Sequence, residues 1–155
     1  ETLVDSIEVG PQPSSLVLDR FGKLWTVTDG RTAGIPAALY RIDAATRRVE
    51  QTYTFAAGDH PSSVTLNGTR DTLYFINRDV WRMRVDAEEL PVTPFLPYTQ
   101  TTYYEVAVDP LTSEVYVADA IDYVQHGVVY RFTARGTAVD TIRVGITPGS
   151  FCFKP

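Results

Sequence analysis

The sequence predicts an all-β chain that forms part of a β-propeller. Three observations lead to this prediction. Short apolar strands recur in groups of four with a period of about 45 residues, and turn-forming residues separate them. No stretch of roughly ten residues or more shows helical periodicity. A single four-stranded sheet cannot bury both of its faces alone, so units of this kind stack radially around an axis.

The repeat is clearest when the two ends of the chain are compared. Residues 4–10 (VDSIEVG) return three periods later as residues 139–145 (VDTIRVG). Both copies run into a turn that contains Pro and Ser, at 13–15 and 148–150, and a middle copy of this turn lies at 61–63. The chain therefore repeats one kind of unit rather than joining several different domains.

Each unit is predicted to hold its strands in a fixed order. First strands follow the Pro and Ser turns, at 16–18, 64–66, 106–108 and 151–153. Second strands are expected at 24–27, 73–76 and 115–118, and third strands at 39–43, 83–86 and 130–132. Closing strands are expected at 49–55, 92–95 and 139–144. Tight-turn sequences join the first two strands of each unit, at 19–22, 67–69 and 109–112.

These strands define one partial propeller domain over residues 1–155, with three blades at about 13–57, 61–97 and 103–145. Residues 1–10 are predicted to be the last strand of a preceding blade, and residues 148–155 the first strand of a closing blade. Three blades cannot close a ring, because propellers use roughly four to eight. We therefore expect the C-terminal half of a larger propeller, whose exposed blade faces pair with the missing N-terminal half or with a second copy.

Composition narrows the function classes. The chain has 155 residues, is 44% hydrophobic and carries a formal net charge of -5. An acidic surface repels phosphate backbones, so we expect no nucleic-acid partner. No apolar run reaches the roughly 18–20 residues of a membrane span. The single cysteine, Cys152, aligns with the strand positions of Val17, Thr65 and Ala107, so we expect a buried, inert thiol.

Function is expected on one face of the propeller. Turns between first and second strands are short and uniform, whereas the other connections are longer and differ in every unit, which is where function is usually grafted on a rigid scaffold. Tyrosines suit such a site because they offer a broad ring and a polar tip. The candidate ligand-binding residues on these loops are Asp29, Arg31, Asp59, His60, Arg78, Tyr98, Tyr103, Tyr104, Asp122, Tyr123, Gln125 and His126.

No catalytic residue and no metal ligand set is predicted. The two histidines lie in different units and fit no spaced ligand motif. Ser14–Ser15 and Ser62–Ser63 repeat without a nucleophile-elbow context, which favours a role in the turns. Asp119 and Asp122 could act as an acid–base pair, but aspartates in such loops more often accept backbone N–H groups.

The motifs also resemble a known group. Residues 13–19 (PSSLVLD) with 22–25 (GKLW) resemble surface-layer-type, YncE-like β-propeller lipoproteins of Bacteroidetes. Residues 119–131 (DAIDYVQHGVVYR) and 144–154 (VGITPGSFCFK) are similar to a recurrent stretch and to the C-terminus of the same proteins. The resemblance covers essentially the whole chain. It implies export to the outer membrane and a lipid anchor outside this sequence. Some relatives capture vitamin B12 and pass it to an outer-membrane transporter.

Three functions remain open from the sequence. The first is a non-catalytic, surface-exposed propeller that captures a ligand, with a corrinoid or another nutrient as the ligand and no cofactor. The second is a propeller hydrolase or lactonase with a metal in its channel, although no acidic position repeats near the start of the first strands. The third is a scaffold that binds other proteins through its outer rim.

Overall fold

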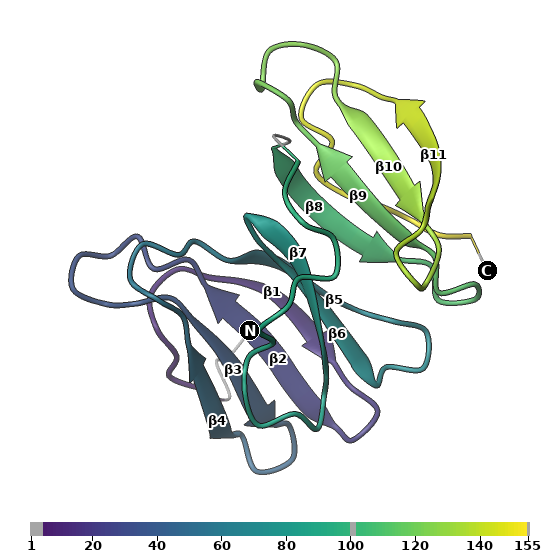
Figure 1. Ribbon diagram of the computed structural model, residues 1–155. Helices are drawn as coiled ribbons and strands as arrows, with labels where there is room; N and C mark the ends of the chain where they lie inside the picture. The colour runs from purple at the N-terminus through teal and green to yellow at the C-terminus, as the bar shows by residue number, and fades with distance from the viewer. Residues whose placement is uncertain (1–4, 100–101, 155) are drawn as a thin grey trace.

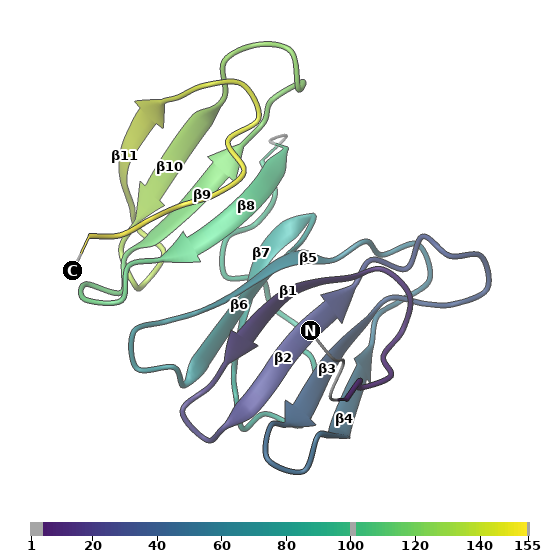
Figure 2. The same ribbon diagram turned by 180° about the vertical axis from the view of Figure 1, so that it is seen from behind.

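Three antiparallel sheets stacked side by side make up the described chain (Figures 1 and 2). This computed structural model describes residues 5–99 and 102–154. The first blade contains β1 (Pro13–Leu18), β2 (Lys23–Thr28), β3 (Ala38–Asp43) and β4 (Arg48–Thr54). The second contains β5 (Ser62–Leu66), β6 (Thr72–Asn77) and β7 (Asp79–Arg84). The third contains β8 (Tyr103–Val108), β9 (Val115–Asp119), β10 (Val128–Phe132) and β11 (Ala138–Arg143).

The order of strands within each sheet follows the order in the sequence, as the repeat predicts. Each strand pairs with the next along the chain, so every blade is a simple antiparallel meander. Central strands are the most buried, and β6 has four consecutive buried residues because blades lie on both of its faces. The three antiparallel sheets confirm the all-β prediction. Among the described residues, no helix could cross a membrane.

The second blade differs from the prediction, because its closing strand is missing. Residues 92–95 form no strand, and the sheet has three strands. In place of a closing strand, Leu96 forms a single bridge to Val80 of β7, and the N–H of Phe95 also donates to the Val80 carbonyl. Pro91, Pro94 and Pro97 explain the difference, since each proline removes a backbone donor that a strand would need.

Neither end of the described chain forms the single strand expected there. Residues 5–12 and 144–154 have no strand, while residues 1–4 and 155 lie outside the described part. A strand needs hydrogen bonds to a neighbour, and neither segment pairs with a strand among the described residues. Cys152 is consequently exposed, so the expectation of a buried thiol is wrong.

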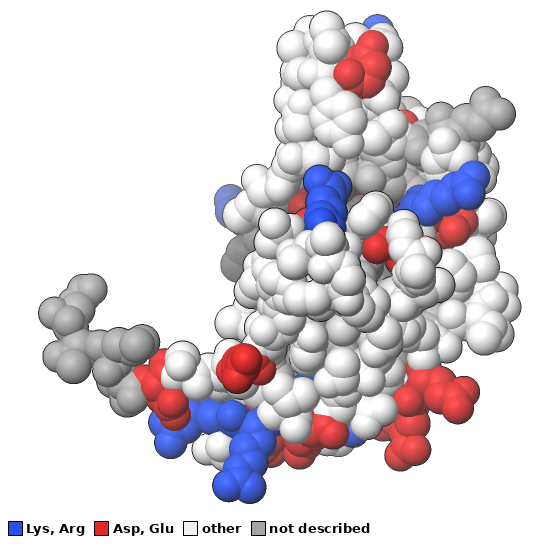
Figure 3. Space-filling view, turned by 90° about the vertical axis from the view of Figure 1, so that its left-hand side faces the viewer, with Lys and Arg blue, Asp and Glu red and all other residues white. Residues whose placement is uncertain are grey.

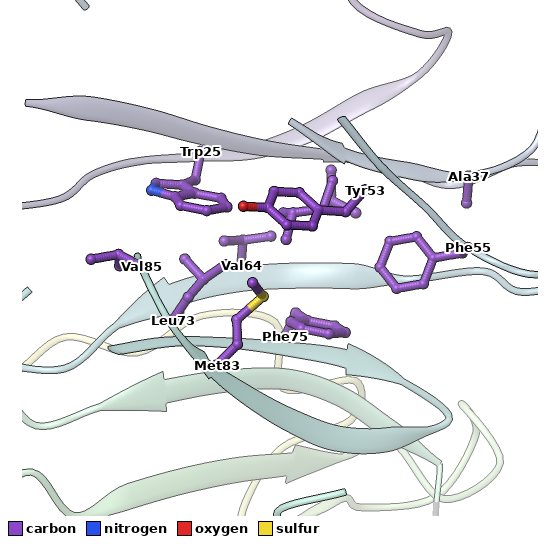
Figure 4. Close-up of a cluster of buried hydrophobic side chains, with 11 residues drawn as sticks. Trp25, Ala37, Tyr53, Phe55, Val64, Leu73, Phe75, Met83 and Val85 are labelled. Atoms are coloured by element: carbon purple, nitrogen blue, oxygen red, sulfur yellow. The ribbon is translucent and has the colours of Figure 1, made fainter. Parts of the chain in front are cut away.

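Blades one and two meet through a layer of large apolar side chains (Figure 4). Trp25 and Tyr53 of the first blade stack with ring centroids 5.8 Å apart. Below them in Figure 4 lie Leu73, Phe75 and Met83 of the second blade. Trp25 and Leu73 are completely buried. Burial of side chains of this size contributes about 1.5–3 kcal/mol each relative to exposure, so this layer fixes the two sheets against each other.

The same arrangement recurs at the next junction. Tyr74 occupies in β6 the position that Trp25 has in β2, and it packs among Val106 and Val108 of the third blade. Tyr116 holds this position in β9, and its ring lies 5.3 Å from that of Phe153 and 6.3 Å from that of Phe151. The C-terminal segment therefore lies against the third blade where the first strand of a further blade would lie (Figure 2).

The first strand of each blade, β1, β5 or β8, is its inner strand, and a serine near the start of β1 and of β5 links one blade to the next. Ser15 and Ser63 both adopt positive φ angles, 57° and 53°, beside an irregularity in the strand register. The Ser15 hydroxyl accepts the N–H of Val64 at 3.1 Å, and the Ser63 hydroxyl accepts the N–H of Val106 at 2.9 Å. Each hydroxyl thus satisfies a donor of the following blade that would otherwise be buried without a partner.

The short turns lie together on the face opposite the long loops. The N–H of Arg20 in the first turn donates to the carbonyl of Arg70 in the second, at 3.0 Å. Gly68 lies against the Pro110 carbonyl of the third turn so closely that a Cβ would collide with it. Charged side chains gather at the bottom of the molecule in Figure 3. Lys23, which directly follows the first turn, pairs with Asp43 at 2.6 Å and with Glu50 at 2.7 Å, and these side chains are partly exposed. Ion pairs near the surface contribute little stability.

The serine link predicts a specific loss of stability. Ser63→Ala leaves the buried N–H of Val106 without an acceptor, which costs about 1–3 kcal/mol. Ser14→Ala is the control, because Ser14 is an exposed serine that directly precedes Ser15, the equivalent of Ser63 in the first blade. Urea unfolding of the two variants measures the difference. Equal stability of both variants would contradict a link between the second and third blades.

Candidate functional site

A cavity of about 590 Å³ opens on the face that carries the long loops. It lies at the starts of the three inner strands β1, β5 and β8, where the three blades converge. A volume of this size falls within the range of small-molecule sites, roughly 300–1,000 Å³. Seven of the predicted candidates line it: Arg31, His60, Arg78, Tyr98, Tyr103, Tyr104 and Tyr123.

Two of these candidates owe their positions to tight backbone turns. Arg78 occupies the tip of the hairpin between β6 and β7 with a positive φ of 59°. Its guanidinium lies 4.5 Å from the centre of the Tyr98 ring, a cation–π distance. The N–H of Tyr98 in turn donates to the Asp79 carboxylate at 2.6 Å, which fixes the loop after the second blade. Arg78 and Tyr98 are therefore presented as one unit at the cavity rim.

On the side of the first blade, Asp29 organises the rim without lining it. Its carboxylate lies 3.5 Å from the Arg31 guanidinium, and its carbonyl oxygen is 2.8 Å from Nδ1 of His60. A carbonyl can only accept, so Nδ1 of His60 carries the proton of that bond and Nε2 is free to accept when the ring is neutral. The β2–β3 loop and the loop before β5 are joined in this way.

On the side of the third blade, two tyrosines form an exposed aromatic corner. The rings of Tyr104 and Tyr123 meet edge to face, with centroids 5.9 Å apart. The two residues are 38% and 53% exposed, respectively. Edge-to-face packing of this kind leaves ring surface open to a bound molecule.

The remaining predicted candidates lie outside the cavity lining and have local structural partners. The carboxylate of Asp59 accepts the N–H of Ala56. The N–H groups of Gln125 and Val124 hold the pKa of Asp122 below its ordinary value, and the amide of Gln125 also donates to this carboxylate. His126 contacts the Val144 carbonyl through Nδ1 at 3.0 Å. Asp119 is buried and accepts the N–H groups of Thr102 and Ile121, as expected for a loop aspartate.

Sequence reasoning missed several residues that line the cavity: Ser14, Ser15, Ser62, Ser63, Ile76, Thr102, Glu105 and Gly149. Ser15, Ser63 and Glu105 occupy equivalent positions in the three blades, and repetition points to structure rather than to function. The signal that could have identified them as lining residues is their place near the start of the inner strands, next to the turns that precede these strands. An inner strand that starts at the loop face must line the axis there.

Glu105 is the carboxylate among the described lining residues. It is half-buried, and its Oε1 accepts the hydroxyl proton of Ser63. Burial raises the pKa of this carboxyl above its ordinary value of 4.5, while the bonds from Ser63 and from the N–H of Val106 act in the opposite direction. No group of three or more His, Cys, Asp or Glu residues in the described chain is arranged to hold a metal ion.

Comparison with solved structures places the chain among β-propellers. It resembles a quinoprotein alcohol dehydrogenase-like protein from Bacteroides thetaiotaomicron, with 16% identity and a TM-score of 0.64 over 84% of this chain. It also resembles hydrazine synthase from Kuenenia stuttgartiensis, with 12% identity and a TM-score of 0.70 over 93% of this chain. The Swd1 propeller domain from Myceliophthora thermophila matches 84% of this chain, with 16% identity and a TM-score of 0.57.

These likenesses establish the fold and no more, because all of the identities are low. The chain spans 33%, 40% and 42% of the lengths of those three chains, which agrees with a partial propeller. No family model matches the sequence, and no curated protein matches it. The class defined by the fold is therefore a partial β-propeller with a cavity on its loop face.

The raised pKa of Glu105 predicts a pH dependence of stability. Between the ordinary value and the raised one, the folded state binds more protons than the unfolded state, so stability from this group falls as pH rises through that window. Glu105→Gln removes the charge, so the stability of this variant relative to wild type should increase between about pH 4 and pH 7. Urea unfolding across this range measures the change.

Glu89→Gln is the control for that series, because Glu89 is an exposed glutamate outside the cavity lining. If the Glu105→Gln difference changes with pH no more than the Glu89→Gln difference does, burial does not raise the pKa of Glu105, which would contradict the environment described above.

Proposed function

We propose that this partial propeller is a non-catalytic binding protein that holds a small soluble ligand in the cavity on its loop face. The observation that carries the proposal is the convergence of Arg31, Arg78 and His60 with four tyrosines on one cavity. They come from loops of all three blades, and pockets that gather a few polar groups and aromatic rings are the usual places of ligand binding. The rigid stacked blades fix these loops at little entropic cost.

Ligand capture at a bacterial cell surface is the finer form of this proposal. It includes export, a lipid anchor outside this sequence and delivery to an outer-membrane transporter. Its support is the sequence resemblance to surface-layer-type propeller lipoproteins. A corrinoid is the ligand that this resemblance suggests, and a broad cavity walled by tyrosines is compatible with a large, flat, partly polar molecule.

A binding screen tests the general form of the proposal. Amide NMR spectra recorded against a library of small polar compounds should show ligand-induced shifts at Arg31, Arg78 and Tyr104. Tyr104→Ala should weaken the binding of each such ligand. Phe21→Ala, which removes an exposed ring on the opposite face, should leave the affinity unchanged. Shifts confined to the short turns would show that the loop face is not the binding face.

Cobalamin tests the corrinoid form separately. Micromolar cobalamin should raise the midpoint temperature of thermal unfolding if the native state binds it, because a ligand that binds only the folded state stabilises that state. Tyr104→Ala should reduce this rise and Phe21→Ala should not. An unchanged unfolding temperature at saturating cobalamin would reject the corrinoid while leaving the general proposal to the screen.

A further inference from the structure

We infer that the ligand of this cavity is an acidic carbohydrate, a short chain of sugar rings that carry carboxylates. The inference rests on the proposed function and goes further by naming the class of ligand. Three properties of the lining carry it: two arginines at the rim, a large number of hydroxyl groups, and exposed tyrosine rings.

The charge of the lining is opposite to that of the chain. The protein carries a formal net charge of -5, yet Arg31 and Arg78 both line the cavity. Arg78 has no carboxylate partner among the described residues and is held over Tyr98, with its guanidinium accessible at the hairpin tip. Arg31 is 70% exposed at its side chain, and its contact with Asp29 is made through Nε, which leaves its terminal nitrogens available.

Glu105 is the one acidic side chain among the described lining residues, so it can balance only one of the two arginines. Its carboxylate accepts the Ser63 hydroxyl and is half-buried. The other nearby carboxylates, Asp29 and Asp79, lie outside the lining, where Asp29 contacts Arg31 and Asp79 accepts the N–H of Tyr98. The two arginines therefore supply planar donors to the cavity lining, a geometry that matches carboxylates and phosphates.

Hydroxyl groups provide the second property. Nine of the described lining side chains carry a hydroxyl: four serines, one threonine and four tyrosines. A hydroxyl both donates and accepts, so a lining of this kind matches a ligand that is itself rich in hydroxyls. A purely aromatic acid would leave these groups without partners when it displaced their water, which is costly.

The tyrosine corner provides the third. Tyr104 and Tyr123 line the cavity, meet edge to face and both keep exposed surface. The apolar faces of sugar rings can pack on such surfaces while their hydroxyls reach the polar tips. Small inorganic anions use no aromatic wall, so the three properties together favour an acidic sugar over free phosphate or sulfate.

Calorimetric titration with a galacturonic acid trisaccharide tests the inference. The matched probe is its methyl ester, which keeps the rings and hydroxyls and removes the negative charges. Wild-type protein should bind the acid at least about tenfold more tightly than the ester, the ratio expected for one lost charge-assisted contact of about 1.4 kcal/mol. Arg31→Gln and Arg78→Gln should each remove most of this preference.

Arg135→Gln is the matched control, because Arg135 is an exposed arginine in the turn between β10 and β11 and does not line the cavity. It should bind the acid as wild type does. Equal binding of acid and ester would overturn the acidic class while supporting a carbohydrate site. The carbohydrate inference would be overturned if neither probe binds while other compounds still shift the amide NMR signals of the loop face. That result would leave the proposed function intact.

Discussion

The structure depends on the packing of each inner strand against the inner strand of the next blade. A blade of this size has two apolar faces, and only a neighbouring blade can cover them. Ser15 and Ser63 set the register of this stacking, because each accepts a backbone N–H from the blade that follows. The buried aromatic positions of the second strands, Trp25 and Tyr74, fill the space beside these links.

This stacking also produces the site. Because the inner strands β1, β5 and β8 lie side by side, their starting ends and the loops that precede them meet at one place. Residues far apart in the sequence, such as Arg31 and Tyr123, then line one cavity. The opposite face carries the short turns, where Asp19 accepts the N–H groups of Phe21 and Lys23 and the Nε1–H of Trp25. The cavity and the short turns thus lie on opposite faces.

The sequence predicts the sheets well, because strand spacing and turn chemistry are local properties. It fails where a strand depends on its neighbours. Three prolines prevent residues 92–95 from pairing, and the segment that contains Cys152 forms no hydrogen-bonded pairing with a described strand. For the site, the variable loops identify the face and the residues at its rim. Glu105 and Ser63 escape such reasoning, because their repeated positions look purely structural although both line the cavity.

Amide hydrogen exchange tests the stacking of inner strands most directly. Val64, Val106 and Leu16 hold equivalent positions in the three blades, but only Val64 and Val106 follow a described blade whose serine accepts their N–H. We predict that the amides of Val64 and Val106 exchange only through large-scale unfolding, while the amide of Leu16 exchanges much faster. Equally fast exchange at all three positions would contradict the account, because it would mean that the blades do not hold one another in place.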